Sequence, residues 1–213
     1  MAFTPLRIAT IKPLRKLNFE LYIFFKEQYI KYSERGSEIP EDKFLKLKNQ
    51  KIAKFYIQDN DELNYQTFLD QLLNETVKDP QMKMEEKVNI IEGAATTALE
   101  RMQDDPGNAT NFKMTQNAAK GLRQIVEKNP DALKNIFGRK AIDSELLVKH
   151  SLNVSALASK LAQLLKHTEE EIENIGTAGL LHDIGVTKLK KEEQDLFKKD
   201  PKKFTSDDKR LYG

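Results

Sequence analysis

The sequence of 213 residues contains no cysteine and no tryptophan, and it contains only three histidines. Without cysteine, disulfide bonds and thiol chemistry are excluded, and any bound metal ion must take nitrogen and oxygen ligands. The absence of cysteine also fits a reducing compartment. The chemistry of a site therefore has to be sought among a few imidazoles, carboxylates and lysines.

Long apolar runs and a charge excess of one sign are also lacking. No segment approaches the roughly 18 consecutive apolar residues that a membrane-spanning helix needs, and the start, MAFTPLRIATIKPLRKL, lacks the apolar core of a signal peptide. The formal net charge is only +2, although 32% of the residues are charged. A polymeric nucleic acid is not an expected partner, because its binders usually concentrate basic residues on one face. We expect a soluble, cytoplasmic protein with no membrane partner.

The first third of the sequence has the character of strands. The range 19–25 is rich in aromatic and β-branched residues, 28–32 alternates apolar and polar residues, and 52–57 predicts a further strand. Lys26 and Glu27 separate the first two as a hairpin, although their chemistry is not that of the preferred Asn-Gly turn. Asp61 is placed to cap the following helix. We predict a small α/β domain over residues 1–76, made of antiparallel strands with helices, which senses or docks a partner.

From residue 77 onward the apolar residues recur at helical spacing, and no convincing strand is found. We divide this region into a helical extension over 84–140 and a helical core over 143–213. Asp143 or Ser144 is expected to cap a helix whose buried stripe comprises Leu147, Val154, Leu157, Leu161 and Leu164. Thr168 and Glu171 have the spacing of a capping box for the next helix, which Gly185 is placed to end.

His150 and the pair His182-Asp183 are the candidate functional residues. His150 shares a face with Leu147 and Val154, so its ring is predicted to point into the bundle, where a histidine alone is usually a hydrogen-bonded core residue. The pair His182-Asp183 ends an apolar helix, and burying an imidazole beside a carboxylate is costly unless something compensates. A divalent ion would compensate; the alternative is that backbone groups or the pair itself satisfy both side chains.

Two motifs carry a family resemblance. The run Leu180-Leu181-His182-Asp183-Ile184-Gly185 resembles the signature of the HD superfamily of metal-dependent phosphohydrolases. The run His150-Ser151-Leu152-Asn153-Val154 resembles the helix that supplies that family's first histidine ligand. The spacing of the two histidines, 32 residues, is similar to that of HD-GYP proteins. The resemblance implies an α+β chain whose second part is an all-α HD-type bundle, truncated at its C-terminus.

The resemblance also implies a metal centre and an activity. His150 and His182 would be imidazole ligands, and Asp183 would be a catalytic carboxylate ligand that bridges two ions. Members of the family hold two or three divalent ions, often iron, with manganese or zinc as alternatives, and hydrolyse cyclic di-GMP in bacterial signalling. Two-metal hydrolysis lowers the pKa of a bridging water and stabilises the charge that develops on the phosphate.

The sequence departs from the family at three points. Val186 stands where the family usually has a phosphate-contacting lysine, so Lys188 is only a weak candidate for that contact. No histidine follows His182, and the Gly-Tyr-Pro element is missing. Thr205 to Asp208 also predicts a helix start with few residues after it. We therefore expect an incomplete and inactive portion of a longer enzyme.

A second hypothesis belongs to another functional class. The chain would be a non-catalytic HD module that binds a cyclic dinucleotide or a protein partner, the latter through its N-terminal domain, and a homodimer is possible. His167 is interpreted as a surface or capping residue, because it lies in a short link between two helices. A third interpretation, a purely structural scaffold, remains open beside these two.

Overall fold

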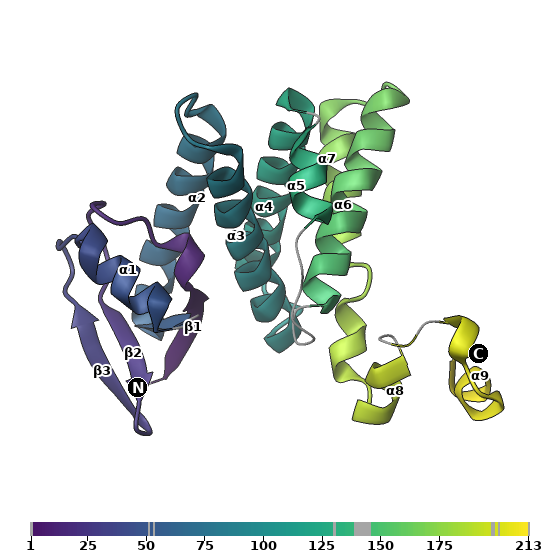
Figure 1. The fold of residues 1–213 in the computed structure, drawn as a ribbon, viewed down its shortest axis with the longest axis horizontal. Helices are drawn as coiled ribbons and strands as arrows, with labels where there is room; N and C mark the ends of the chain where they lie inside the picture. The colour runs from purple at the N-terminus through teal and green to yellow at the C-terminus, as the bar shows by residue number, and fades with distance from the viewer. Residues whose placement is uncertain are drawn as a thin grey trace.

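A four-stranded antiparallel sheet forms the first part of the chain. In this computed structural model the described residues are 2–50, 52, 54–129, 131–138, 146–196, 199 and 201–212. The strand order is β1 (Phe3–Arg7), β4 (Lys54–Gln58), β2 (Leu21–Phe25) and β3 (Gln28–Ser33), and all paired neighbours are antiparallel. The predicted α+β class is confirmed (Figure 1). Strand β1 was not predicted; it lies at an edge of the sheet, where its Pro5 is tolerated.

The hairpin between β2 and β3 confirms the predicted turn at Lys26 and Glu27. Both residues have positive φ angles, 47° and 62°. A turn with two positive φ angles is of the I′ kind, whose twist matches that of the flanking strands. Glycine and asparagine favour such a turn, and the chain uses neither. The hairpin therefore forms at the cost of two strained residues.

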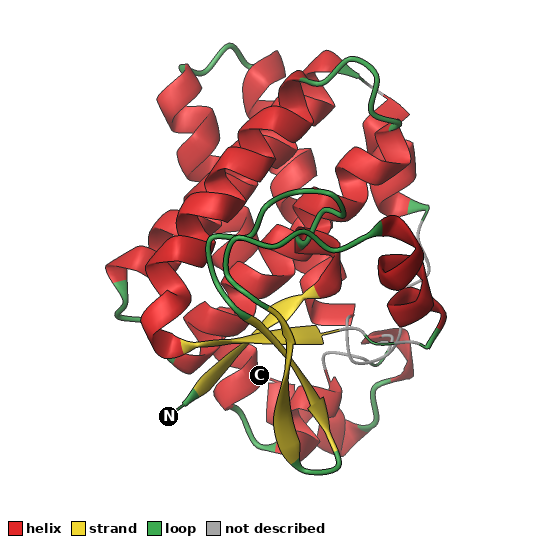
Figure 2. Cartoon of the chain, turned by 90° about the vertical axis from the view of Figure 1, so that its left-hand side faces the viewer, coloured by secondary structure: helices red, strands yellow, loops and turns green. Residues whose placement is uncertain are grey.

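One face of the sheet belongs to the buried core, and α3 (Met84–Asp104) contacts its edge strand β1. Leu6, Phe55 and Ile57 are fully buried, and the alternation along β4 leaves Tyr56 on the other face. Helix α1 (Glu41–Asn49) and the short η1 (Ile8–Thr10) and η2 (Asp59–Asp61) complete this part. Figure 2 shows the sheet lying below the long helices.

Helix α2 (Glu62–Lys78) begins directly after Asp61, but the prediction that the Asp61 side chain caps it is wrong. Its side chain makes no capping bond. The carboxylate instead accepts hydrogen bonds from the backbone N–H of Glu20 at 3.2 Å and from Asn64 at 3.0 Å, and it pairs with Arg35. Asp61 thus links the loop before β2 to the start of α2. The spacing of residues within one helix does not predict such a long-range contact.

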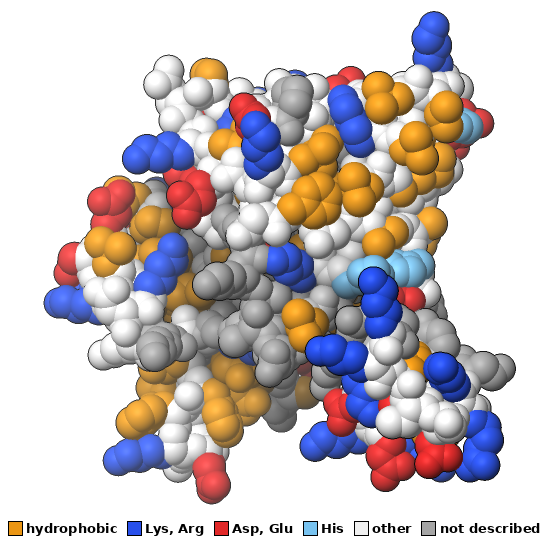
Figure 3. Space-filling model, turned by 45° about the vertical axis from the view of Figure 1, so that its right-hand side comes forward, with side chains coloured by type: hydrophobic (Ala, Val, Ile, Leu, Met, Phe, Trp, Pro, Cys, Tyr) orange, Lys and Arg blue, Asp and Glu red, His pale blue; other side chains and the backbone are white. Residues whose placement is uncertain are grey.

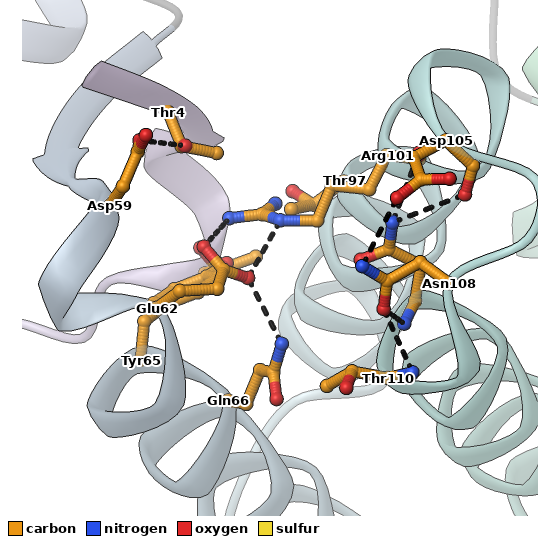
Figure 4. A network of polar contacts seen from close by, with 12 residues as sticks. Thr4, Asp59, Glu62, Tyr65, Gln66, Thr97, Arg101, Asp105, Asn108 and Thr110 are labelled. Atoms are coloured by element: carbon orange, nitrogen blue, oxygen red, sulfur yellow. Dashed lines mark hydrogen bonds and ion pairs between the residues drawn. The ribbon is translucent and has the colours of Figure 1, made fainter. Parts of the chain in front are cut away.

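An ion pair joins the first part of the chain to the helices that follow. Arg101, on α3 (Met84–Asp104), lies 2.9 Å from each carboxylate oxygen of Glu62 on α2. The same guanidinium lies 5.1 Å from the ring centre of the buried Tyr65 (Figure 4). Desolvation raises the pKa of the Tyr65 phenol. The predicted domain boundary at residues 76–77 falls within the last turn of α2. Buried residues form one continuous core on both sides of it, and the division into two domains stays a prediction.

The bundle contains α3, α4 (Ala109–Lys128), α5 (Asp131–Phe137), α6 (Leu146–Leu164) and α7 (Glu169–Leu181) (Figure 1). Asn108 caps α4 by accepting from the N–H groups of Thr110 and Asn111 (Figure 4). The predicted capping box of Thr168 and Glu171 at the start of α7 is confirmed. Asp143 and Ser144 lie outside the described residues. Among the described residues after 77, no strand occurs.

The chain then continues through η4 (Ile184–Lys188), which contacts α3. Beyond it, α8 (Lys191–Leu196), η5 (Pro201–Lys203) and α9 (Ser206–Tyr212) extend away from the bundle (Figure 1). The helix start predicted at Thr205 is confirmed, since Asp208 N–H donates to the Thr205 hydroxyl at 3.1 Å. None of the described helices combines the length and the apolar character needed to cross a membrane.

The burial predicted for α6 is wrong. The leucines of its expected core stripe lie on the outside, with Leu157 at 52%, Leu161 at 58% and Leu164 at 69% exposure. The buried face consists mainly of small residues: Ser151, Leu152, Ser155, Ala156, Ser159 and Ala162. The helix is apolar on two sides, and hydrophobic spacing alone does not tell which side meets the bundle.

Candidate metal centre

Small residues let α6 and α7 approach closely. Ser155 on α6 donates a hydrogen bond from its hydroxyl to the carbonyl of Gly176 on α7, at 2.7 Å. A Cβ atom on Gly179 would lie 2.8 Å from the Ser155 Cα, and one on Gly176 would lie 2.6 Å from the Ser159 hydroxyl. Backbones can pack this closely only where side chains are absent or small. This packing brings the start of α6 beside the end of α7.

Three candidate ligands converge at that point. The Nε2 atoms of His150 and His182 lie 3.1 Å apart. An Asp183 carboxylate oxygen lies 3.1 Å from His182 Nε2 and 3.5 Å from His150 Nε2. The three residues predicted to share a site therefore lie together, and they are the group of potential metal ligands found among the described residues.

The end of α7 explains how two consecutive residues reach one point. His182 is the C-terminal capping residue of α7, with φ −56° and ψ −33°, and Asp183 follows with φ −106° and ψ 16°. The backbone leaves helical geometry at Asp183, so its side chain is freed from the 100° offset that separates neighbours on a helix. Gly185 was expected to end the helix, but the helix ends at Leu181, before it.

The backbone orients the ring of His182. Its Nδ1 atom lies 2.9 Å from the carbonyl oxygen of Gly179. A carbonyl can only accept, so Nδ1 carries the proton in this contact, and the lone pair of the neutral ring is on Nε2. That atom faces His150 and Asp183. In histidines that bind a metal ion through one ring nitrogen, the other nitrogen typically donates a hydrogen bond in this way. This carbonyl partner was not predicted, although the spacing of Gly176 and Gly179 in an apolar helix signals a close helix contact.

The prediction that the His150 ring points into the bundle is wrong. Its side chain is 55% exposed, compared with 34% for His182 and 24% for Asp183. The cluster therefore opens to solvent on the side of His150. A ligand could enter there without displacing the core.

The distances between the three atoms fit a single divalent ion. Two ligand atoms that each lie about 2.1 Å from an ion are about 3.0 Å apart at a right angle and about 3.4 Å apart at a tetrahedral angle. The observed separations, 3.1, 3.1 and 3.5 Å, lie close to that range. Two imidazoles and a carboxylate suit iron, manganese or zinc. Three protein ligands leave further coordination positions free.

The remaining candidates belong to the segment after Asp183 and to the link between α6 and α7. Lys188 is exposed at the end of η4, and Val186 is partly buried in the same turn. His167 lies at the far end of α6, after Leu164, and its Nδ1 is 3.4 Å from the Glu171 carboxylate. Three contacts to that carboxylate, from the Thr168 N–H and hydroxyl and from His167, lower the pKa of Glu171. Within one chain, His167 is therefore a residue of the α6–α7 link, as predicted.

Comparisons with known proteins agree with this geometry. Residues 122–211 match the HDOD domain family. The fold is similar to a solved structure described as Bd1817, a HDG"Y"P protein from Bdellovibrio bacteriovorus, with a TM-score of 0.67 over 99% of this chain and 68% of that chain. The chain carries an HD-type domain. The sequence identity to Bd1817 is 22%, so this likeness concerns the fold. No curated protein matches the sequence.

The HD-type domain contains all three clustered residues. The matched segment, 122–211, includes α6, α7 and the turn at Asp183. The predicted resemblance to HD-GYP-type HD domains is confirmed at the level of the domain and its fold.

Proposed function

We propose that this chain is part of a metal-dependent phosphodiesterase of HD-GYP type that acts on a cyclic dinucleotide, with cyclic di-GMP as the expected substrate. The observation that supports this is the convergence of His150, His182 and Asp183 within 3.5 Å of one another. The HD-type fold of the domain supports the same proposal.

In this proposal each residue has a defined part. His150 and His182 would hold a divalent ion as imidazole ligands, and the Gly179 carbonyl would keep the His182 ring in the required tautomer. Asp183 would be the carboxylate ligand, and it would supply negative charge for a further ion. Lys188 would contact a phosphate oxygen. When bound, divalent iron, manganese or zinc supplies a more acidic water and neutralises charge on the phosphodiester.

Three ligands are few for a two- or three-metal hydrolase, so we propose that the chain by itself binds a metal ion and turns over substrate poorly or not at all. A non-catalytic HD module is the second candidate. It is favoured by Val186, which stands where the resemblance predicts a phosphate-binding lysine. The protein partner of the N-terminal sheet stays a prediction.

Metal content tests the proposal directly. The protein would be stripped with a chelator, reloaded with Fe²⁺, Mn²⁺ or Zn²⁺, and analysed for bound metal. We expect tight binding in the wild-type protein and at least a tenfold loss of affinity in His182→Ala and Asp183→Asn. Asp207→Asn, the same change at an exposed carboxylate on α9, serves as the matched control. Equal metal content in all of these proteins would reject the ligand assignment.

Cyclic di-GMP then separates the two candidates. Hydrolysis that depends on Asp183 supports the enzyme, whereas binding without turnover in the metal-loaded protein supports the binding module. The same assay repeated with a longer form of the protein, if its gene extends beyond Gly213, would show whether further residues complete the centre.

A further inference from the structure

A small cavity lies beside Asp183, and neither of the two candidate histidine ligands lines it. Its volume is about 10 Å³, and its polar lining consists of Gln103, Ser151 and Asp183. Its apolar lining includes Leu99, Leu180 and Ile184. The histidine side of the cluster is different, because Figure 3 shows histidine side chains at the surface, next to Lys and Arg side chains. Asp183 therefore borders both the open histidine cluster and a space between α3, α6 and α7.

The cavity has the size and the polar partners that one water molecule needs. A single water requires roughly 10–15 Å³ of such space and two to four hydrogen-bonding groups. The side-chain amide of Gln103 and the hydroxyl of Ser151 can each donate and accept, and the carboxylate of Asp183 accepts. A water between them would donate to Asp183 and to the amide oxygen of Gln103, and it would accept from Ser151. All of its hydrogen bonds would thus go to groups that line the cavity.

The Asp183 carboxylate can contact the histidines and such a water at the same time. Its Oδ2 atom makes the contacts with both imidazoles, at 3.1 Å from His182 Nε2 and 3.5 Å from His150 Nε2. A hydrogen bond from a water to Oδ1 would fix the rotation of the carboxylate plane. Carboxylates that bind metal ions are commonly held by hydrogen bonds of this kind, and losing the partner weakens metal binding.

Gln103 lies on a part of α3 that its neighbours hold in place. Two residues before it, the Arg101 guanidinium pairs with Glu62 on α2 at 2.9 Å. The carbonyl of Arg101 accepts a hydrogen bond from the Asn111 side chain on α4 at 3.2 Å. Helix α3 also contacts η4, the turn that directly follows Asp183. A side chain carried by a helix that is fixed in this way can keep a metal ligand in one orientation.

We propose that Gln103 is a positioning residue of the metal centre, which holds the Asp183 carboxylate through one water molecule shared with Ser151. Gln103 lies outside residues 122–211, the segment that matches the HDOD domain family. A helix that precedes the HD-type domain therefore completes the surroundings of a ligand that lies within it. This inference rests on the proposed metal-binding function, and it adds a residue to which the resemblance gives no role.

Metal affinity and the spectrum of bound Mn²⁺ provide the first test. Gln103→Met keeps the length of the side chain but removes its hydrogen-bonding groups, so we expect it to weaken Mn²⁺ binding about tenfold. The electron paramagnetic resonance spectrum of the bound Mn²⁺ should change as well, because the carboxylate is free to rotate. Gln124→Met, at a partly buried glutamine on α4, is the matched control and should change neither. Wild-type affinity and spectrum in Gln103→Met would overturn this inference and leave the proposed function standing.

A double-variant cycle with Ser151→Ala provides the second test. Because both side chains act through the same water, the double variant should bind Mn²⁺ about tenfold more weakly than the wild-type protein, as each single variant does. Urea unfolding would show that all three variants are folded. A double variant that binds about a hundredfold more weakly would show that the two side chains act separately, and it would overturn the shared water. A wild-type protein that binds no Mn²⁺ would reject the proposed function and this inference together.

Discussion

Gly179 lies directly against Ser155, so that a Cβ atom on the glycine would come within 2.8 Å of the Ser155 Cα atom. This contact determines how closely α6 and α7 approach, and therefore how closely His150 approaches His182. The carbonyl of the same glycine accepts from the His182 ring. One residue thus supports both the spacing and the orientation of the candidate ligands.

We predict that Gly179→Ala separates the two helices. The added methyl group meets backbone atoms, which cannot move aside without shifting a helix, so the free energy of unfolding should fall by about 1–3 kcal/mol. The metal affinity should fall with it. Gly185→Ala is the control, because a methyl group at that position would have no other atom within 4 Å. Urea unfolding and metal titration would measure both effects; identical behaviour of the two variants would contradict the role given to this contact.

The ion pair between Arg101 and Glu62 should stabilise the joint between α2 and α3. Arg101 is only 8% exposed, and its removal in Arg101→Met would leave the Glu62 carboxylate without its main partner. We expect a loss of about 2–4 kcal/mol, somewhat below the value for a fully buried pair because Glu62 keeps some access to water. The double variant with Glu62→Gln should lose less than the sum of the single losses. Additive losses in this cycle would show that the pair does not act as a unit.

The turn at Lys26 and Glu27 should be improved by glycine. Since Glu27 has a φ of 62°, Glu27→Gly removes strain and is expected to raise the free energy of unfolding by about 0.5–1 kcal/mol. Lys43→Gly, within α1, should instead lower it by about 1 kcal/mol, because glycine is unfavourable inside a helix. Thermal unfolding of both variants would measure this contrast. A destabilised Glu27→Gly would mean that the turn has another conformation.

The stability of the start of α9 should depend on pH in the acid range. Hydrogen bonds from Lys199 and from the Thr205 N–H and hydroxyl lower the pKa of Asp208 to about 2. A carboxyl whose pKa is lowered on folding stabilises the fold above its unfolded pKa, about 3.9, and this contribution is lost as the pH falls through about 2. Carboxyl NMR shifts of Asp208 should follow that midpoint, and Asp208→Asn should abolish the dependence. A midpoint near 4 would contradict the capping role.

The helices and strands were easier to predict from the sequence than the face that each of them buries. Local features could be predicted because they form between residues that are close in the sequence. They include the helical spacing, the capping box at Thr168 and the hairpin at Lys26-Glu27. Strand β1 and the hydrogen bonds of Asp61 depend on partners far along the chain, and they were missed. The outward leucines of α6 belong to the same class, because only packing selects which apolar side faces the bundle.

The sequence by itself determined the residue types of the candidate centre, two imidazoles and a carboxylate without any thiol, and the helices that carry them. Only the tertiary structure decided that the Nε2 atoms of His150 and His182 lie 3.1 Å apart, that the cluster opens to solvent, and that a glycine carbonyl orients one ring. The physical reason is that ligand geometry is set by the approach of two helices, and the space between Gly179 and Ser155 governs that approach.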